Sequence, residues 1–250
     1  MEKRQFIKDL VLTSIAMPIG FSGMAKAFES HSEKSPSALA EDNAFWEQIR
    51  QQYILKPDYI NLENGYYNFL PQPILNKYIE HIKEINYQGS YYMRTVQWEN
   101  KQKSVIALAQ IAGCTPEELI ITRNTTESLD TIIGGIHWQA GDEAIMAEQD
   151  YGAMLDMFKL VSERHGVVNK MISVPNHPKD DAEIVALYKN AITPKTKLVM
   201  LNSPNNPSGS MYTKEEYEAL ATILEQYPNI YVLSDEIYEY INFVGKHESI

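Results

Sequence analysis

Short apolar runs alternate with longer amphipathic segments through the second half of the chain. The apolar runs predict strands at 119–122, 143–147, 168–174, 197–201 and 230–234. Segments with helical spacing of their apolar residues lie between them, at 125–138, 151–165, 180–192 and 213–227. Apolar strands that alternate with helices are typical of a parallel sheet buried on both faces. The pattern predicts an α/β fold, with a mostly parallel sheet covered by helices on both faces.

The first half of the chain has mainly helical patterning. Helices are predicted near 43–55, 73–86 and 99–112, with one short strand at 59–62. Thr115 is followed by Pro116 and, three residues on, by Glu118. This spacing is typical of a capping box with proline at the first helical position, so it predicts a short helical turn before the strand at 119–122.

Composition narrows the class of protein. The chain has 250 residues and is 44% hydrophobic, which predicts one large domain over residues 43–250. A net charge of −11 argues against nucleic acid as a partner, because binding to phosphate backbones needs a basic surface. Cys114 is the only cysteine, so an internal disulfide and a cysteine metal cluster are excluded, and the six histidines show no ligand spacing. No metal site is predicted.

The N-terminus has the order of a secretory signal. Lys3 and Arg4 precede the apolar stretch 10–21, and small residues follow it. We expect a signal peptide over 1–27, similar to a twin-arginine signal with lysine in place of the first arginine, and then a linker over 28–42. The apolar stretch is too short for a membrane span. The prediction is a periplasmic or exported protein, and the alternative is an N-terminal amphipathic helix on a cytoplasmic protein.

Two polar phrases follow apolar strands near the end of the chain. Residues 202–209 read Asn-Ser-Pro-Asn-Asn-Pro-Ser-Gly, and residues 234–238 read Ser-Asp-Glu-Ile-Tyr. They place the amide of Asn206, the carboxylate of Asp235 and the phenol of Tyr238 at neighbouring strand ends, where ligands of open α/β sheets bind. A carboxylate can hold a pyridine nitrogen protonated, while an amide and a phenol can hold a ring oxygen. These groups suit pyridoxal 5′-phosphate.

Residues 198–243 resemble the class I, aspartate aminotransferase-like members of the fold-type I pyridoxal-phosphate enzymes. The resemblance implies that Asp235 pairs with the pyridine nitrogen of the cofactor. It also implies that Asn206 and Tyr238 contact the oxygen on the cofactor ring. The alternative interpretation is an ordinary turn at 202–209 and a helix-capping acid at Asp235.

Residues up to about 201 resemble class V of the same superfamily, which holds cysteine desulfurases and isopenicillin N epimerase-like proteins. The segment 122–129, Thr-Arg-Asn-Thr-Thr-Glu-Ser-Leu, opens a predicted helix. The resemblance implies that Thr125 and Thr126 bind the cofactor phosphate at this helix N-terminus. It also implies that Tyr151 stacks on the pyridine ring. The alternative for the helix N-terminus is plain helix capping, and the alternative for Tyr151 is packing on the core. Because the two halves resemble different classes, the chain is either an intermediate branch of the superfamily or two joined sequences.

The resemblance also predicts a Schiff-base lysine and a substrate-binding arginine, and neither is identified in this sequence. The lysine that forms a Schiff base with the cofactor would follow a further strand beyond Asp235, where the chain offers only Lys246. The small C-terminal domain, with its substrate-binding arginine, is not seen either. We therefore identify no catalytic residue, expect the N-terminal part of a larger enzyme, and expect these 250 residues alone to lack transamination.

The function implied is that of an aminotransferase-like protein acting on an amino acid or keto acid, with a homodimer as the full-length form. The class V likeness keeps epimerase or lyase chemistry open. A non-catalytic truncated or joined gene product is the alternative outside enzymology. Arg94, among tyrosines in a predicted loop, could clamp a substrate carboxylate or form a surface salt bridge.

Overall fold

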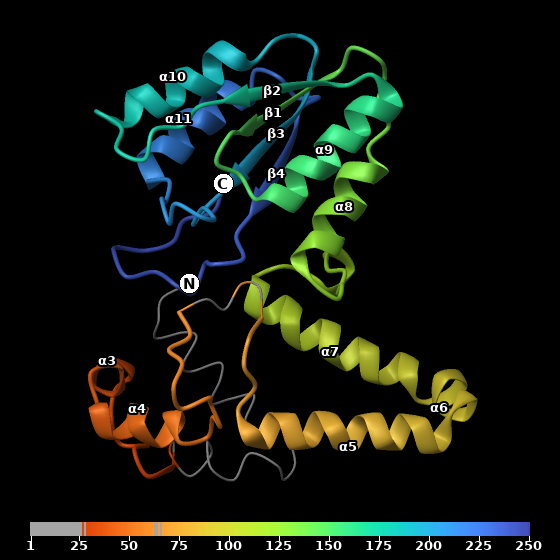
Figure 1. Ribbon diagram of the computed structural model, residues 1–250, viewed down its shortest axis with the longest axis vertical. Helices are drawn as coiled ribbons and strands as arrows, with labels where there is room; N and C mark the ends of the chain where they lie inside the picture. The colour runs from red at the N-terminus through yellow and green to blue at the C-terminus, as the bar shows by residue number, and fades with distance from the viewer. Residues whose placement is uncertain (1–26, 28, 63–64, 66) are drawn as a thin grey trace. The chain divides into compact units, whose positions relative to one another are not determined.

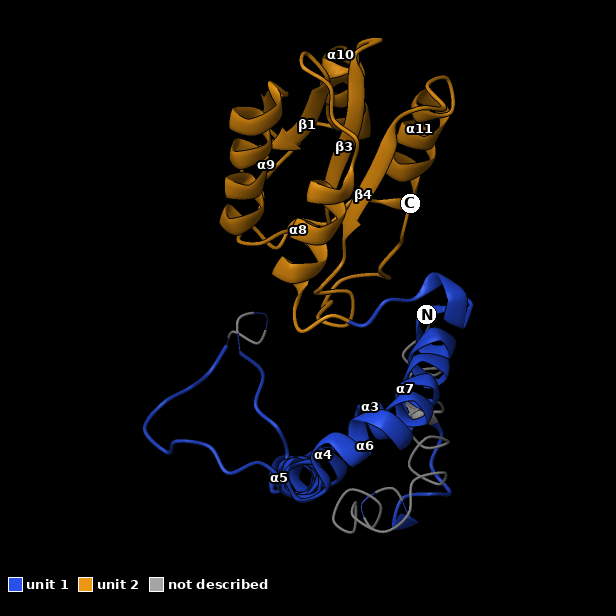
Figure 2. Cartoon of the chain, turned by 90° about the vertical axis from the view of Figure 1, so that its right-hand side faces the viewer, with its two compact units in different colours: residues 1–121 blue, residues 122–250 orange. Residues whose placement is uncertain are grey.

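The computed structural model describes residues 27, 29–62, 65 and 67–250. The chain divides into two compact units, residues 1–121 and residues 122–250 (Figure 2). The boundary falls inside the segment 43–250 that the sequence predicts as one major domain.

The first unit is helical. Its described elements are α3 (Pro36–Ala40), α4 (Asn43–Arg50), α5 (Gln72–Gln88), α6 (Ser90–Thr95), α7 (Gln97–Ala112) and the 3-10 helix η1 (Pro116–Glu118). The long predicted helices are present, and α4 ends five residues earlier than predicted. The predicted capping box is also present, because the side chains of Thr115 and Glu118 both cap η1.

The predicted linker over 28–42 contains the short helix α3. Its N-cap is Ser35, whose hydroxyl oxygen accepts a hydrogen bond from the backbone N–H of Ala38. Leu39 of α3 packs with Ala27 and Phe45 in a small buried cluster. This segment is therefore partly helical, and its helix packs against α4.

Two predicted strands are not formed. Residues 59–62 and 119–122 contain no strand. Ile60 and Ile120 have exposed fractions of 83% and 82%, so their apolar side chains are not covered within the described residues. An apolar run becomes a strand only when a neighbouring strand supplies its backbone hydrogen bonds, and the composition of the run does not reveal that neighbour.

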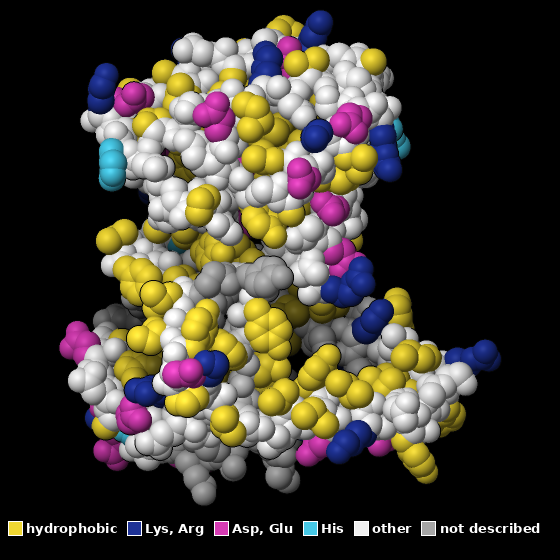
Figure 3. Space-filling model, in the orientation of Figure 1, with side chains coloured by type: hydrophobic (Ala, Val, Ile, Leu, Met, Phe, Trp, Pro, Cys, Tyr) yellow, Lys and Arg dark blue, Asp and Glu magenta, His cyan; other side chains and the backbone are white. Residues whose placement is uncertain are grey.

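Helices α5 and α7 expose apolar side chains. Tyr78, Ile82 and Trp98 are between 49% and 70% exposed. Hydrophobic side chains are visible over this part of the first unit in Figure 3. The predicted amphipathic pattern of α5 is thus present, but its apolar face has no buried residue within the described structure.

The second unit contains a parallel four-stranded sheet. Its strands are β1 (Glu143–Ala147), β2 (Val168–Ile172), β3 (Thr196–Asn202) and β4 (Tyr231–Asp235), in the spatial order β2-β1-β3-β4. All three strand pairs are parallel. Asn202 at the end of β3 lies beside Asp235 at the end of β4. The predicted α/β class and the parallel sheet are confirmed.

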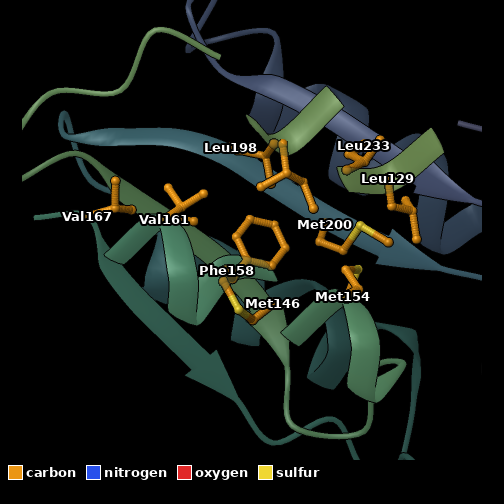
Figure 4. Close-up of a cluster of buried hydrophobic side chains, with 11 residues drawn as sticks. Leu129, Met146, Met154, Phe158, Val161, Val167, Leu198, Met200 and Leu233 are labelled. Atoms are coloured by element: carbon orange, nitrogen blue, oxygen red, sulfur yellow. The ribbon is translucent and has the colours of Figure 1, made fainter. Parts of the chain in front are cut away.

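Helices cover both faces of this sheet (Figure 1). They are α8 (Thr125–Gly135), α9 (Gly152–His165), α10 (Asp181–Ala191) and α11 (Lys214–Leu224). Alternate strand residues point to opposite faces, so Met200 packs with α8 and α9 while Val199 and Leu201 pack with α10 and α11. Phe158 of α9 is fully buried among the side chains of the first face (Figure 4).

The predicted signal peptide lies outside the described residues, apart from Ala27. Among the helices that the structure describes, none is both long and apolar enough to cross a membrane.

Candidate cofactor site

The strand order places a topological switch point between β1 and β3. From β1 the chain moves outward to β2, and it then returns to the other side of β1 to form β3. The loops that leave β1 and β3 therefore run in opposite directions and open a crevice at the carboxyl end of the sheet, which is where open α/β sheets bind ligands. The loop after β1 holds Tyr151, and the loop after β3 holds Asn206.

A cavity of about 420 Å³ brings Thr125 and Asp235 together. Thr125 is the first residue of α8, and Asp235 is the last residue of β4. Thr122, Asn124 and Ser128 add hydroxyl and amide groups to the wall. Thr126 is half-buried in the same turn of α8 and does not line this cavity. The other predicted cofactor contacts, Tyr151, Asn206 and Tyr238, are not part of its lining either.

The N-terminus of α8 is suited to an anion. The backbone N–H groups of the first helical turn lack partners within the helix, and the helix dipole places partial positive charge there. The side chain of Asn124 accepts a hydrogen bond from the N–H of Glu127 at 2.8 Å, so it caps the helix as a simpler interpretation predicts. Capping by Asn124 satisfies the N–H of Glu127 and leaves the N–H groups of Thr125 and Thr126 to other acceptors.

Asn206 and Tyr238 contact each other. The side-chain amide nitrogen of Asn206 donates a hydrogen bond of 3.3 Å to the phenolic oxygen of Tyr238. Both side chains are half-buried. The two residues that the resemblance assigns to one ring oxygen are thus held side by side, although they are 32 positions apart in the sequence.

Asp235 is buried, with an exposed fraction of 5%. Burial raises the pKa of its carboxyl, and the charge of Glu236 acts in the same direction, while the N–H of Ile237 opposes the rise. A buried carboxylate gains from a nearby cation because its own hydration has been lost. Asp235 is therefore suited to pair with a protonated ring nitrogen.

Asn202 is a buried polar residue next to Asp235. The two residues are partners in the parallel register, so their side chains leave the same face of the sheet. Asn202 is 3% exposed, and neither polar atom of its side chain has a hydrogen-bond partner among the described residues. Buried amides normally have partners, so this orphan group points to a bound molecule or water. Asn202 lines a second pocket, together with Asp150 and Asn205, and not the cavity that holds Thr125 and Asp235.

Asp150 lies in the loop that leaves β1, directly before Tyr151. It is 6% exposed, and its carboxylate accepts hydrogen bonds from the N–H of Ala147 at 2.8 Å and from the amide of Asn205 at 3.4 Å. Burial raises the pKa of the Asp150 carboxyl to about 7; the charge of Asp235 acts in the same direction, and the bond from Ala147 opposes it.

Two further residues, Tyr151 and Arg94, were predicted to contact the cofactor or the substrate. Tyr151 is half-buried and packs against the buried cluster formed with α8 and α9, so the alternative of core packing holds at least in part. Arg94 belongs to the first unit and is exposed in the last turn of the short helix α6, not in a loop as predicted. The roles of both residues toward a ligand remain predictions.

The residues present fit pyridoxal phosphate. An anion-binding helix terminus and a buried carboxylate line one cavity, as the phosphate and the ring nitrogen of that cofactor require. The unpartnered amide of Asn202 lies beside the carboxylate. Sequence reasoning missed Asn202 and Asp150, although each stands at or just after a strand end, the position that already singled out Asp235.

Comparison with known proteins identifies the family. The family model for aminotransferase class I and II matches residues 57–248. The chain belongs to this family. The prediction of the aminotransferase superfamily is thereby confirmed, and the match extends through the first half of the chain, where the sequence resembles class V.

Two relatives illustrate the similarity. Aspartate/prephenate aminotransferase of Thermus thermophilus is 37% identical over 136 residues, and aspartate aminotransferase of Bacillus subtilis is 35% identical over 136 residues. Each match covers 54% of this chain and 33% of the relative. The chain therefore matches about a third of the length of these relatives.

Solved structures share the fold. C-DES, in a mutant with glycine covalently linked to its PLP cofactor, has a TM-score of 0.62 and 20% identity, over 75% of this chain and 49% of the other. A double mutant of Thermus thermophilus aspartate aminotransferase has a TM-score of 0.50 and 24% identity, over 76% of this chain and 57% of the other. At these identities the likeness establishes the fold alone.

Proposed function

We propose that the second unit binds pyridoxal 5′-phosphate for aminotransferase chemistry on an amino acid or keto acid. The observation that carries this proposal is the shared cavity of Thr125 and Asp235. The resemblance assigns these residues to opposite ends of one small molecule. A cofactor that contacts both residues needs both of them in the lining of one cavity. Membership of the aminotransferase class I and II family supports the same reaction type.

The residues of the chain would divide the work of binding and orientation. Thr125 and the helix terminus bind the phosphate, and Asp235 keeps a proton on the ring nitrogen. Asn206 and Tyr238 hold the ring oxygen and so fix the rotation of the ring. Pyridoxal phosphate, when bound, supplies an aldehyde that reacts with amino groups and a ring that withdraws electrons. Stacking by Tyr151 and carboxylate binding by Arg94 are further parts of the proposal.

The relatives bear on the substrate. The proteins from Thermus thermophilus and Bacillus subtilis are named for aspartate, which supports an amino acid and its keto acid as partners of this chain. A homodimer as the assembled form and export through a twin-arginine-like signal remain parts of the proposal.

Binding of pyridoxamine 5′-phosphate to the full chain tests the proposed function. This compound carries the phosphate and the pyridine but no aldehyde, so it cannot form stray imines with surface lysines. We expect saturable binding with one site per chain in isothermal titration calorimetry. Pyridoxamine, which lacks the phosphate, should bind at least about tenfold more weakly, because it loses charge-assisted hydrogen bonds at the helix terminus.

Two threonines of α8 provide a matched pair of variants. Thr125→Val removes a hydroxyl from the cavity wall, whereas Thr131→Val removes an exposed hydroxyl further along the same helix, where it donates to the carbonyl of Glu127. Only Thr125→Val should weaken binding of pyridoxamine phosphate. No binding by the unaltered chain, or equal effects of the two variants, would reject the proposed site.

A further inference from the structure

The two loops at the switch point are joined by a pair of side chains that the family resemblance does not assign. The loop after β1 carries Asp150 and the predicted ring-stacking residue Tyr151. The loop after β3 carries Asn205 and the predicted ring-oxygen contact Asn206. Asp150 and Asn205 each stand directly before a residue predicted to contact the cofactor, and they are hydrogen-bonded to each other.

Asp150 is anchored on the side of β1. Its second carboxylate oxygen accepts the N–H of Ala147, the last residue of β1, at 2.8 Å, and its own N–H donates to the carbonyl of Ala147 at 3.1 Å. Asp150 is therefore fixed to the end of the strand at two points, one through its carboxylate and one through its backbone. Its first oxygen is left to face Asn205, whose amide nitrogen lies 3.4 Å away and also 3.5 Å from the carbonyl of Gln149.

Asn205 organises the loop after β3. Its side-chain oxygen accepts hydrogen bonds from the N–H and the hydroxyl of Ser208, at 3.2 and 2.8 Å. Its backbone N–H donates to Ser210, and its carbonyl accepts the N–H of Gly209. A shift of Asn205 would move this whole turn, and Asn206 with it.

We propose that Asp150 is a positioning residue that fixes Asn206 through Asn205 and so sets the geometry of the cofactor ring. Asp150 and Asn205 line a separate pocket and not the cavity that holds Thr125 and Asp235, so the effect of Asp150 on that cavity is indirect. The inference rests on the proposed function, since it assigns a role within the same site. It adds a residue for which the resemblance gives no role, and a route by which that residue acts.

A structural role of Asp150 predicts a different outcome. If Asp150 only satisfied the N–H of Ala147, its loss would destabilise the fold without acting through Asn205. Asn205→Ala separates the two roles, because it removes the bond between the loops, together with the two bonds from Ser208, and leaves the bond from Ala147 to Asp150 in place. It also keeps the inference testable if Asp150→Ala fails to fold.

The experiment is a double-mutant cycle measured by binding of pyridoxamine phosphate to the full chain near pH 8. We expect Asp150→Ala and Asn205→Ala each to weaken binding by about three- to tenfold, the loss of one to two hydrogen bonds. In an Asn206→Ala background the same two changes should lower the affinity for pyridoxamine phosphate by less than about twofold, because the contact between Asn206 and the ring oxygen is already lost. Asp150→Asn, which keeps an acceptor oxygen, should weaken binding less than Asp150→Ala.

Asp142 supplies the matched control at the other end of β1. Its carboxylate accepts the N–H of Gln139 at 2.8 Å, as Asp150 accepts that of Ala147. Asp142→Ala should lower the melting temperature and leave binding unchanged. The inference would be overturned if Asn205→Ala bound pyridoxamine phosphate normally. It would also be overturned if Asp150→Ala and Asn205→Ala lowered the affinity by the full amount in the Asn206→Ala background. Neither result would argue against the cofactor site itself. Absence of binding by the unaltered chain would instead reject the proposed function, and this inference with it.

Discussion

The amide nitrogen of Asn206 lies 3.3 Å from the phenolic oxygen of Tyr238 and donates a hydrogen bond to it. The two residues come from loops after adjacent strands, β3 and β4. The contact orients both side chains, so a ring oxygen placed there would meet two groups that are already positioned. Preorganisation of this kind lowers the cost of ordering side chains when a ligand binds.

The first prediction concerns this pair. Tyr238→Phe removes the hydroxyl and leaves the amide of Asn206 to hold the ring oxygen alone. A neutral hydrogen bond contributes about 0.5–1.5 kcal/mol, so affinity for pyridoxamine phosphate should fall by about two- to tenfold in titration calorimetry. The thermal melting curve should show a fold that is still intact. A loss of more than about a hundredfold would mean that Tyr238 has a larger role than holding the ring oxygen.

The second prediction concerns the partner of the ring nitrogen. Asp235→Asn removes the buried charge that keeps this nitrogen protonated, and charge-assisted hydrogen bonds contribute about 1.5–3 kcal/mol. Affinity for pyridoxamine phosphate should fall by about ten- to a hundredfold, which is more than Tyr238→Phe costs. The ultraviolet spectrum of the bound ligand should also shift toward its unprotonated form. The reverse order of the two variants would require their roles to be exchanged.

The sequence predicted the sheet of the second unit closely. The strand at 143–147 is found at those residues. β3 extends one residue beyond the predicted strand at each end, β4 is shifted by one residue, and β2 ends two residues earlier than predicted. β1 and β3 are buried on both faces, so their composition reports their environment directly. Ile60 and Ile120 belong to equally apolar runs, but the partners that decide whether such runs pair are distant in sequence and carry no local signal.

The residues of the site could be predicted where they belong to short sequence motifs. Asp235 was found because it follows a predicted strand and belongs to a motif that resembles one in the class I enzymes. Asp150 and Asn202 have the same kind of position. The significance of Asp150 lies in its burial and in a hydrogen-bond partner 55 residues away, and that of Asn202 lies in a buried amide without a partner among the described residues. Such relationships depend on the strand order, which the pattern of elements alone leaves open.

The third prediction tests the core behind the site. Phe158 is fully buried in the cluster between α9 and the sheet. Phe158→Ala should lower the free energy of unfolding by about 3–5 kcal/mol, because it removes buried apolar area and leaves a cavity. Urea denaturation followed by circular dichroism measures the change. Exposed Phe243, with an exposed fraction of 92%, is the matched control, and Phe243→Ala should change stability by less than about 0.5 kcal/mol.

The fourth prediction separates capping from phosphate binding at α8. Asn124→Ala removes the cap on the N–H of Glu127 and should cost about 1 kcal/mol of stability. Asn124→Asp keeps a capping oxygen but adds a negative charge to the cavity wall. It should therefore retain stability and weaken binding of pyridoxamine phosphate, with no comparable effect on pyridoxamine. Equal effects on both compounds would place the phosphate elsewhere.

The last prediction follows from the buried carboxyl of Asp150, whose pKa is raised from its ordinary value of 3.8 to about 7. Between these two values the folded protein binds more protons at this site than the unfolded chain does. The contribution of Asp150 to stability is therefore most favourable at low pH, falls as the pH rises toward 7, and is constant above that.

Asp150→Asn isolates this contribution because the amide does not titrate. Between about pH 5.5 and pH 8, the unaltered protein should lose about 2 kcal/mol more unfolding free energy than the variant, at about 1.4 kcal/mol for each pH unit below the folded pKa. Urea denaturation at both pH values gives the comparison, and titrating groups that do not interact with Asp150 cancel in the difference. Parallel pH profiles would mean that Asp150 is already ionised in the folded protein at pH 5.5, and that the loop bonds from Ala147 and Asn205 outweigh the cost of its burial.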